Sequence, residues 1–268
     1  MNDNVKPALL VTGGAGGIGG STADQWVAAG GRVAILDLSA EAVQAKVDEL
    51  GVDVAVGVPV DVRDDAAVRE AVRTAAETFG ARLDAVVNCA GIAKPIVAAE
   101  DSDEDWVRMV DIHLNGHMRV NRAAHRYLEN SDRAAVVNIS SIAGSVGLPG
   151  RTNYSAAKAG IEGLTRGLAV EWSPDIRVNC VAPGYVSTPM IDRLVSDGKL
   201  DSAPVIARTP LNRFADPAEI ASAIHFLISP QASFVTGQTL RVDGGLTIEG
   251  DWYASRQRSS ETQLGNAE

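Results

Sequence analysis

The chain has few of the features that mark secreted, membrane-spanning or nucleic-acid-binding proteins. Its two cysteines, Cys89 and Cys180, cannot build a disulfide framework, and both lie in apolar stretches where a reduced cysteine is usually a small core residue. The N-terminal segment MNDNVKPALLVTGG has no basic part followed by a long apolar part, so it lacks the pattern of a signal peptide. The longest uncharged run, 134–150, contains serines, glycines and Pro149 and makes a poor membrane span. These absences predict a reduced, cytoplasmic protein.

Positive charge is also scarce. The 268 residues include 24 Lys and Arg against 34 Asp and Glu, which gives a net charge of −10. A surface this acidic repels phosphate backbones and anionic lipids, so we expect no nucleic acid and no membrane among the partners. The hydrophobic fraction of 46% and the charged fraction of 22% are ordinary for a folded globular protein and argue against a mainly disordered chain.

The sequence does contain a regular alternation of short apolar runs and longer helical patterns. The runs are continuously apolar, as expected of strands that helices cover on both faces, and they span 8–12, 32–37, 53–60, 83–88, 134–140, 176–182 and 238–243. The helical patterns lie between them, at 17–30, 39–50, 64–79, 103–129, 152–172 and 216–228. This alternation predicts a single α/β domain over 1–248, a doubly wound, mostly parallel seven-stranded sheet with helices on both faces (a Rossmann fold).

Two segments interrupt this alternation. Residues 187–215 form a long insertion between a strand and a helix, which in a compact domain is usually a functional lid, here over the substrate. The C-terminal tail, 249–268, follows the last strand and ends polar, as mobile chain ends usually do. Trp252 and Tyr253 in this tail would be covered by the body of the protein or by a neighbouring subunit.

A glycine-rich loop follows the first strand. The strand runs into TGGAGGIGG, residues 12–20, and then into a helix. Gly13, Gly17 and Gly19 give a G-x-x-x-G-x-G pattern, in which backbone N–H groups can approach a pyrophosphate while the helix N-terminus attracts its charge. A glycine cluster alone is weak evidence, but its place between a strand and a helix favours dinucleotide binding.

The second strand ends in an acid, Asp37, 24 residues after Gly13. A carboxylate there accepts hydrogen bonds from the hydroxyls of the adenosine ribose and repels a 2′-phosphate. Because no lysine or arginine lies within 12–20 or directly after Asp37, we predict NAD(H) rather than NADP(H) as the cofactor. The alternative interpretation of Asp37 is an acid near the N-terminus of the next helix.

Tyr154 and Lys158 lie four residues apart and therefore on one face of the helix predicted over 152–172. The Lys158 ammonium and the positive nicotinamide of an oxidised cofactor both favour the phenolate, so we expect the pKa of Tyr154 to be lowered by about 2–3 units. Tyr154 could then take a proton from an alcohol while a hydride leaves, and act as the acid in the reverse reaction. The alternative is a structural tyrosine beside a snorkelling lysine.

With these motifs the sequence resembles the NAD-dependent members of the short-chain dehydrogenase/reductase family over about residues 7–247. The motifs follow the family's order and are TGGAGGIG (12–19), Asp37, DV (61–62), NCAG (88–91), NISS (138–141), YSAAK (154–158), PGYVSTPM (183–190) and TGQTLRVDGG (236–245). The resemblance implies an oxidoreductase that interconverts a secondary alcohol and its ketone by hydride transfer, with Tyr154 as general acid/base.

The resemblance also implies roles for the matching residues. Ser141 would polarise the substrate oxygen, with Ser140 as the alternative. NAD would be bound by Gly13, Gly17, Ile18, Gly19, Asp37, Leu38, Asp61, Val62, Asn88, Ala90, Gly91, Tyr154, Lys158, Pro183, Gly184, Val186 and Thr188. Alternatives are a plain turn at Pro183–Gly184 and a helix N-cap at Thr188.

The substrate would meet a second set of residues, namely Ser141, Ala143, Arg151, Tyr154 and Tyr185. Further candidates for this pocket are Ile92, Lys94, Leu148 and the segment 188–212. Lys94 and Arg151 would favour an anionic substrate, although for each a solvated surface position is the simpler interpretation.

The sequence departs from the family pattern at two positions. Cys89 stands where asparagine is commoner, which is a tolerable change. His113 occupies the position of the family's catalytic asparagine when 110–116 is aligned on its last glycine, whereas Asn115 faces elsewhere on a helix. Because an imidazole both donates and accepts hydrogen bonds, we expect His113 to be a working catalytic substitute, with an impaired proton path as the alternative. His113 and His117 have a metal-ligand spacing, but the other ligands are missing, so no metal is predicted.

The motifs are also compatible with two other functions, and they do not identify the substrate. A 3-oxoacyl-carrier-protein reductase would usually prefer NADPH, against Asp37, and would need a basic patch for its acidic partner. A catalytically weak NAD(H)-binding sensor or scaffold is supported only by His113. The alcohol or ketone substrate is not identified. The resemblance implies a homo-oligomer, a tetramer or else a dimer, formed through 103–129, 152–172 and the C-terminal strand.

Overall fold

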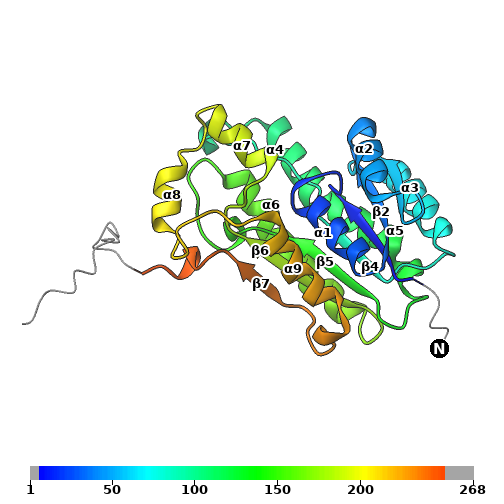
Figure 1. Ribbon diagram of the computed structural model, residues 1–268. Coiled ribbons are helices and arrows are strands. Elements are labelled where there is room, and N and C mark those ends of the chain that lie inside the picture. The colour runs from blue at the N-terminus through cyan, green and yellow to red at the C-terminus, as the bar shows by residue number, and fades with distance from the viewer. Residues whose placement is uncertain (1–5, 251–268) are drawn as a thin grey trace, which may run out of the picture.

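Seven short strands form one parallel sheet in the computed structural model, which describes residues 6–250 (Figure 1). The strands are β1 (Ala8–Thr12), β2 (Arg32–Asp37), β3 (Ala55–Pro59), β4 (Ala85–Asn88), β5 (Ala135–Ile139), β6 (Arg177–Pro183) and β7 (Thr239–Val242). Their order is β3-β2-β1-β4-β5-β6-β7, and every neighbouring pair is parallel. The predicted α/β fold with a doubly wound seven-stranded sheet is confirmed.

The helices lie on both faces of this sheet, as the apolar strands require. They are α1 (Gly17–Ala28), α2 (Ala40–Leu50), α3 (Asp65–Thr78), α4 (Asp103–Val110), α5 (Gly116–Leu128), α6 (Thr152–Glu171), α7 (Pro189–Ser196), α8 (Ser202–Arg208) and α9 (Pro217–Ile228). Short 3-10 turns are η1 (Ala98–Glu100), η3 (Ile142–Gly144), η4 (Pro230–Ala232) and η5 (Leu246–Ile248). Helices α1, α2 and α9 cover one face, and α3, α5 and α6 cover the other.

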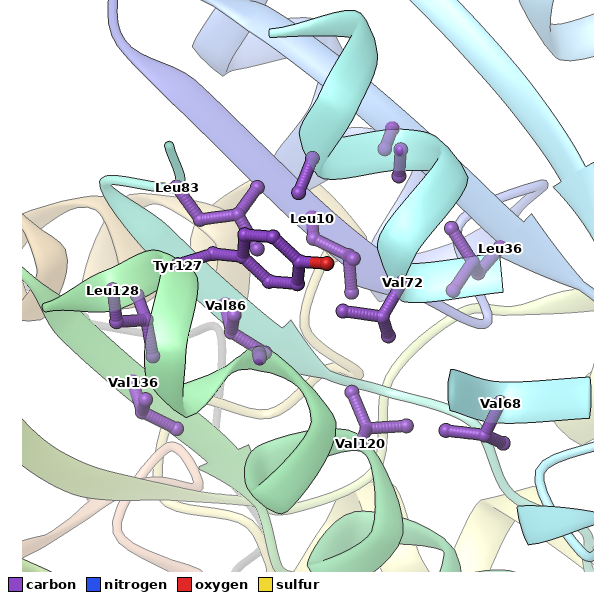
Figure 2. Close-up of a cluster of buried hydrophobic side chains, with 14 of the residues drawn as sticks. Leu10, Leu36, Val68, Val72, Leu83, Val86, Val120, Tyr127, Leu128 and Val136 are labelled. Atoms are coloured by element: carbon purple, nitrogen blue, oxygen red, sulfur yellow. The ribbon is translucent and has the colours of Figure 1, made fainter. Parts of the chain in front are cut away.

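The core on the second face is built almost entirely from aliphatic side chains. Figure 2 shows Leu10, Leu36 and Val86 of the strands pointing toward side chains of α3 and α5. Every residue of β1, β4 and β5 is buried, because helices pack on both sides of these central strands. Full burial of each aliphatic side chain is worth about 1.5–3 kcal/mol, so this core holds the carboxyl ends of the strands in a fixed relation.

The predicted helix over 103–129 is wrong in one respect, because it is three elements rather than one. Helix α4 ends at Val110, a π-turn η2 (Asp111–Asn115) follows, and α5 begins at Gly116. The N–H of Gly116 donates to the carbonyl of Asp111, five residues earlier rather than four. Such a turn inserts one extra residue into a helix and is frequent at functional sites.

The segment 187–215 contains two helices rather than an irregular loop. Helices α7 and α8 lie together at the end of the molecule away from the N-terminus (Figure 1). Among residues 6–250, no helix has the length and apolar character needed to cross a membrane. Trp252 and Tyr253 of the predicted tail lie outside the described residues.

The sheet has one switch point, between β1 and β4. From β1 the chain builds outward to β2 and β3, and it then returns to place β4 on the other side of β1. The loops that leave the carboxyl ends of these two strands run to opposite faces, which opens a crevice between them. The glycine loop after Thr12 and the segment after Asn88 both leave from this crevice, and these two residues are aligned in the sheet.

Candidate active site

The glycine loop fits a ligand that needs close approach to the backbone. Gly13 and Gly17 have φ angles of 63° and 54°, which favour glycine. A Cβ on Gly13 would lie 2.9 Å from the nitrogen of Ala90, and one on Gly19 would lie 2.2 Å from the Gly13 oxygen. Gly16, the N-cap of α1, has nothing within 4 Å of its Cβ position and no side-chain cap, so the first N–H groups of α1 are open to an anion.

Asp37 links this loop to the end of β2. One carboxylate oxygen accepts the N–H of Ala15 at 3.2 Å, and the other accepts the N–H of Leu38 at 2.7 Å. Each oxygen can accept a second hydrogen bond. Asp37 therefore holds the glycine loop and still offers acceptors for a pair of vicinal hydroxyls, so the N-terminal-acid interpretation is the weaker one.

The same cavity is also lined by one acidic and two basic side chains, those of Asp61, Arg63 and Arg108. Arg63 is bound to Asp61 in an ion pair of 2.6 Å, and the Arg63 hydrogen bond is the largest cause lowering the pKa of Asp61. Arg108 also lines the cavity and adds to this lowering, but it forms no ion pair or side-chain hydrogen bond within residues 6–250.

Ser141, Tyr154 and Lys158 meet where β5 and α6 come together. Ser141 and Tyr154 both line the cavity, and a side-chain interaction with Ser141 lowers the pKa of Tyr154. The Nζ of Lys158 donates to the carbonyl of Ile139 at 2.8 Å and lies 5.4 Å from the centre of the Tyr154 ring. Ser140, the alternative to Ser141, instead donates to the carbonyl of Lys158 at 3.0 Å. Ser141 is thus the serine that faces the tyrosine.

Burial sets the protonation of this group. It lowers the pKa of Lys158 from 10.5 to about 8, because the ammonium is removed from water. Burial also raises the pKa of Tyr154, against smaller lowering effects from the Ser141 side chain and the charge of Arg151. The expectation that the pKa of Tyr154 is lowered is therefore wrong for the protein by itself, since desolvation of the phenolate outweighs the nearby positive charge.

His113 occupies the π-turn and faces Tyr154. Its Nε2 lies 3.1 Å from the nitrogen and 2.9 Å from the oxygen of Ile92, and its ring meets the Tyr154 ring edge-on at 5.2 Å. Its buried Nδ1 has no hydrogen-bond partner in the described structure. Burial, and then the charge of Lys158, lower its pKa well below 6.5, so the imidazole is neutral. Asn115 instead donates to Asp111 at 3.0 Å and points elsewhere, as expected.

The segment after β6 completes the cavity from the opposite side. Gly184 is required there because a Cβ would lie 2.9 Å from the Cα of Asp243. Thr188 is the N-cap of α7, as its alternative interpretation proposed, and accepts the N–H of Ile191 at 3.4 Å. Its Cγ2 also lies 3.4 Å from the Cβ position of Gly17, so this segment lies directly over the glycine loop. The resulting cavity has a volume of about 590 Å³.

Comparison with known proteins agrees with this geometry. A family model described as enoyl-(acyl carrier protein) reductase matches residues 13–247. The 3-oxoacyl-(acyl-carrier-protein) reductase of Thermotoga maritima is 36% identical over 247 residues, which cover 89% of this chain and 97% of that protein. The cis-4-hydroxycyclohexanecarboxylate dehydrogenase of Sinomonas cyclohexanicum is 42% identical over 242 residues, which cover 89% and 95%. A crystal structure titled short-chain dehydrogenase/reductase, glucose/ribitol dehydrogenase, from Brucella melitensis superposes with a TM-score of 0.84 at 35% identity and covers 90% of this chain and 96% of that one.

The chain belongs to the short-chain dehydrogenase/reductase family. It is therefore an oxidoreductase of the class that uses a nicotinamide cofactor. The cradle of Gly13, Gly17 and Gly19, which side chains would fill, fits such a dinucleotide.

Most of the predicted short-chain dehydrogenase/reductase site residues line this one cavity. From the predicted cofactor set these are Gly13, Gly17, Ile18, Gly19, Asp37, Leu38, Asp61, Val62, Ala90, Gly91, Tyr154, Lys158, Pro183, Gly184, Val186 and Thr188. His113 and Ser141 of the predicted catalytic set line it too. Gly91 and His113 depend on each other, because a Cβ on Gly91 would lie 2.4 Å from the His113 ring.

Four residues of the predicted site do not line the cavity, and neither do the pocket candidates Lys94 and Leu148. Asn88 is fully buried behind it and donates to Asn121 at 2.7 Å and Asn138 at 3.0 Å, so it ties β4 to α5 and β5 instead. Ala143 is buried within η3. Tyr185 stacks on Phe214 and lines a smaller cavity of about 70 Å³. Arg151 stands just before α6, outside the lining of the main cavity.

Several lining residues were not predicted from the sequence. They are Ala15, Gly16, Leu36, Ala42, Val60, Arg63, Cys89, Arg108, Ile112 and Ile139. The pocket candidate Ile92 and four residues of the segment 188–212, namely Pro189, Met190, Ile191 and Arg193, were expected near the substrate and line the same cavity. Arg108 lies outside every motif, so only the folded arrangement of α4 reveals it.

Proposed function

We propose that the protein is an NAD(H)-dependent dehydrogenase or reductase that interconverts a secondary alcohol and its ketone. The observation that carries the proposal is the meeting of Ser141, Tyr154 and Lys158 in the same cavity as the glycine cradle. Within residues 6–250, Lys158 is the only lysine and Tyr154 the only tyrosine that line this cavity. The geometry supports proton transfer at one end of the cavity and dinucleotide binding at the other.

The proposed chemistry divides between these residues. Nicotinamide, when bound, supplies or accepts the hydride. In oxidation the Tyr154 phenolate takes the hydroxyl proton of the alcohol as the carbinol C–H bond breaks, and in reduction the phenol returns a proton to the carbonyl oxygen. Ser141 donates a hydrogen bond to the same oxygen and holds it beside Tyr154. Because burial raises the pKa of Tyr154, the base form needs the added positive charge of oxidised nicotinamide.

Asp37 and the placement of the basic residues favour NAD(H) in particular. Asp37 offers carboxylate acceptors at the end of β2. The glycine loop, 12–20, has no basic residue, and Arg63 is already bound to Asp61. Arg108 is the cation within the described cavity lining that a 2′-phosphate could recruit at this end, since it is not paired.

The experiment is calorimetric titration with NADH and NADPH of the wild type, Asp37→Ala and Arg108→Ala. We expect NADH to bind at least about tenfold more tightly, and the preference to shrink in Asp37→Ala, because a carboxylate close to a phosphate is repulsive. Arg108→Ala serves as the control, with the preference kept or increased.

Either of two results would change the proposal. Tighter binding of NADPH by the wild type would replace the cofactor and favour the second candidate, a 3-oxoacyl-carrier-protein reductase, which the Thermotoga maritima relative supports. The Sinomonas cyclohexanicum relative instead supports a cyclic secondary alcohol as the substrate. If neither nucleotide binds, the proposed cofactor site is wrong. The alternative of an NAD(H) sensor is then wrong as well, because it also requires binding of NAD(H).

We also propose that the chain forms a homo-oligomer, a tetramer or else a dimer. Large apolar side chains are exposed on the segments that the family resemblance implicates, namely Val107 on α4, Val170 on α6 and Leu240 on β7, and Phe226 on α9 and Phe234 before β7 are exposed as well. Single exposed apolar residues are normal, but an unshielded phenylalanine beside others favours burial against a second copy.

A further inference from the structure

Arg151 stands at the entrance of the helix that carries Tyr154 and Lys158. Its carbonyl accepts the N–H of Ser155 at 2.7 Å, which fixes Arg151 as the residue before the first turn of α6. Arg151 lies three residues before Tyr154, a spacing that makes two side chains neighbours on one side of a helix. Its charge reaches the Tyr154 hydroxyl strongly enough to oppose the effect of burial on the tyrosine pKa.

The Arg151 guanidinium has no anionic partner of its own. It forms no ion pair and no side-chain hydrogen bond with residues 6–250, although the residue is partly buried. Lys94, the other predicted cation of the substrate region, is different, because both carboxylate oxygens of Asp105 hold its Nζ at 2.6 Å. Arg151 is therefore the free cation of the two.

The start of α6 adds to this positive character. The helix has 20 residues, no acidic residue in its first turn and no side-chain cap, so the positive end of its dipole is not neutralised. Asn153, which is 1% exposed, has a side-chain nitrogen without any hydrogen-bond partner in the described structure. Next to Tyr154 the protein thus presents a cation and an unused donor, but no acid within the same turn.

The position of Arg151 also limits what can reach it. Arg151 lies outside the lining of the cavity in which Tyr154 and Ser141 meet, so a group on it cannot be attached directly to the reacting carbon. The lining of the cavity that contains Tyr154 and Ser141 also includes apolar side chains, among them Ile92, Met190 and Ile191. An apolar spacer fits these side chains better than a polar one.

We propose that Arg151 is a specificity-determining residue that binds the carboxylate of a hydroxy acid or keto acid, with an apolar spacer separating the carboxylate from the reacting carbon. The inference rests on the proposed function and narrows its substrate class. The carboxylate takes no part in the hydride or proton transfer. It forms a charge-assisted hydrogen-bonded pair with the guanidinium and so fixes the carbinol carbon beside Tyr154.

The test compares acids with their neutral amides as substrates with NAD⁺. The pairs are 5-hydroxyhexanoate and 4-hydroxycyclohexanecarboxylate, each against its carboxamide. In the wild type we expect kcat/KM for each acid to exceed that for its amide by at least about tenfold, the value of one charge-assisted hydrogen bond, mainly through KM. Arg151→Gln should reduce the ratio to about one, and Arg151→Lys should restore part of it because the charge returns.

Arg166→Gln is the matched control. It removes the same charge from the same helix, at an exposed position 15 residues further on, or about 22 Å away at 1.5 Å per residue. It should leave the acid-to-amide ratio unchanged. Thermal unfolding and NADH titration of Arg151→Gln show whether the helix and the cofactor site are intact.

The outcomes separate the two proposals. Equal turnover of acid and amide by the wild type overturns the carboxylate site and leaves the alcohol dehydrogenase function standing. An equal loss on both substrates in Arg151→Gln assigns Arg151 a structural role and likewise overturns the inference. If no acid and no amide is oxidised, and the corresponding keto acids are not reduced with NADH, the proposed function fails and the inference fails with it.

Discussion

At the scale of single residues, burial decides which groups around Tyr154 carry a charge. Two neutral histidines, His113 and His117, lie within the range of the Lys158 charge. Burial and then this charge lower the pKa of both. For His117 the pKa falls from 6.5 to about 3. The cavity can therefore hold one buried cation at neutral pH, because the neighbouring imidazoles do not compete for a proton with it.

This arrangement predicts a specific loss of stability in acid. Between pH 6.5 and pH 3, His117 is protonated in the unfolded chain but neutral in the folded protein. The free energy of unfolding therefore falls as the pH falls through this range. Between pH 7 and pH 5 the contribution of His117 is about 2 kcal/mol at 1.36 kcal/mol per pKa unit. His117→Leu should remove this part of the fall, as measured by urea unfolding at both pH values.

The control for that measurement is another histidine of the same helix. His125 is only partly buried and contacts Trp172 and Glu129 at the surface. His125→Gln should leave the difference between pH 7 and pH 5 close to that of the wild type. A His117→Leu variant that loses as much stability as the wild type between these pH values would contradict the assignment, whatever its absolute stability.

At the scale of elements, the π-turn between α4 and α5 sets the position of His113. Its Nε2 reaches both backbone atoms of Ile92, so the imidazole connects the turn to the segment that follows β4. One nitrogen cannot donate and accept at once, whereas an asparagine amide supplies both a donor and an acceptor. His113 Nε2 can therefore form a hydrogen bond with either the nitrogen or the oxygen of Ile92, but not with both at once.

His113→Ala and His113→Asn test this connection. If His113 is a working substitute, His113→Ala should lower kcat by about 10- to 100-fold, and His113→Asn should stay within a few fold of the wild type, with NADH affinity kept in both. Steady-state rates and NADH titration provide the comparison. A sharp increase of kcat in His113→Asn would show that the wild-type site is impaired, and would favour the alternative of a weakly active NAD(H)-binding protein.

The strands and most helices could be predicted from the sequence, because they follow the local pattern of apolar residues. The seven runs became the seven strands, and the central strands are buried on both faces, as for Val11 and Val137, whereas the edge strands β3 and β7 are only partly covered. The π-turn was not predicted, because the segment 103–129 contains no proline to mark an interruption of the helix. Motifs located most of the residues that line the cavity but not Asn88, which lies behind it, because a polar residue at a strand end reads the same whether it meets a ligand or a buried amide.

At the scale of the whole molecule, the two edges of the sheet differ in what they expose. Next to β7 lies Phe234, whose side chain is fully exposed, and Leu240 and Phe226 are exposed near it in the chain. At the opposite edge, just before β3, the exposed apolar residue is Val52. Burying an aromatic side chain against a second copy removes 150–250 Å² of surface from water in typical cases, roughly 4–6 kcal/mol for each fully covered ring. The β7 edge is accordingly the one that gains most from assembly.

The last prediction follows from this difference between the edges. The wild type should have a mass in solution of four times the chain mass of 28.0 kDa, or else twice, by light scattering. Phe234→Asp should lower that mass, because each interface would contain an unpaired buried carboxylate, which is far more costly than the lost aromatic contact. Val52→Asp makes the same kind of change at a residue that is also largely exposed, but beside β3, and should leave the mass unchanged. If Phe234→Asp keeps the wild-type mass, the β7 edge is not an interface, and the oligomer, where one is found, must form through the segments 103–129 and 152–172 instead.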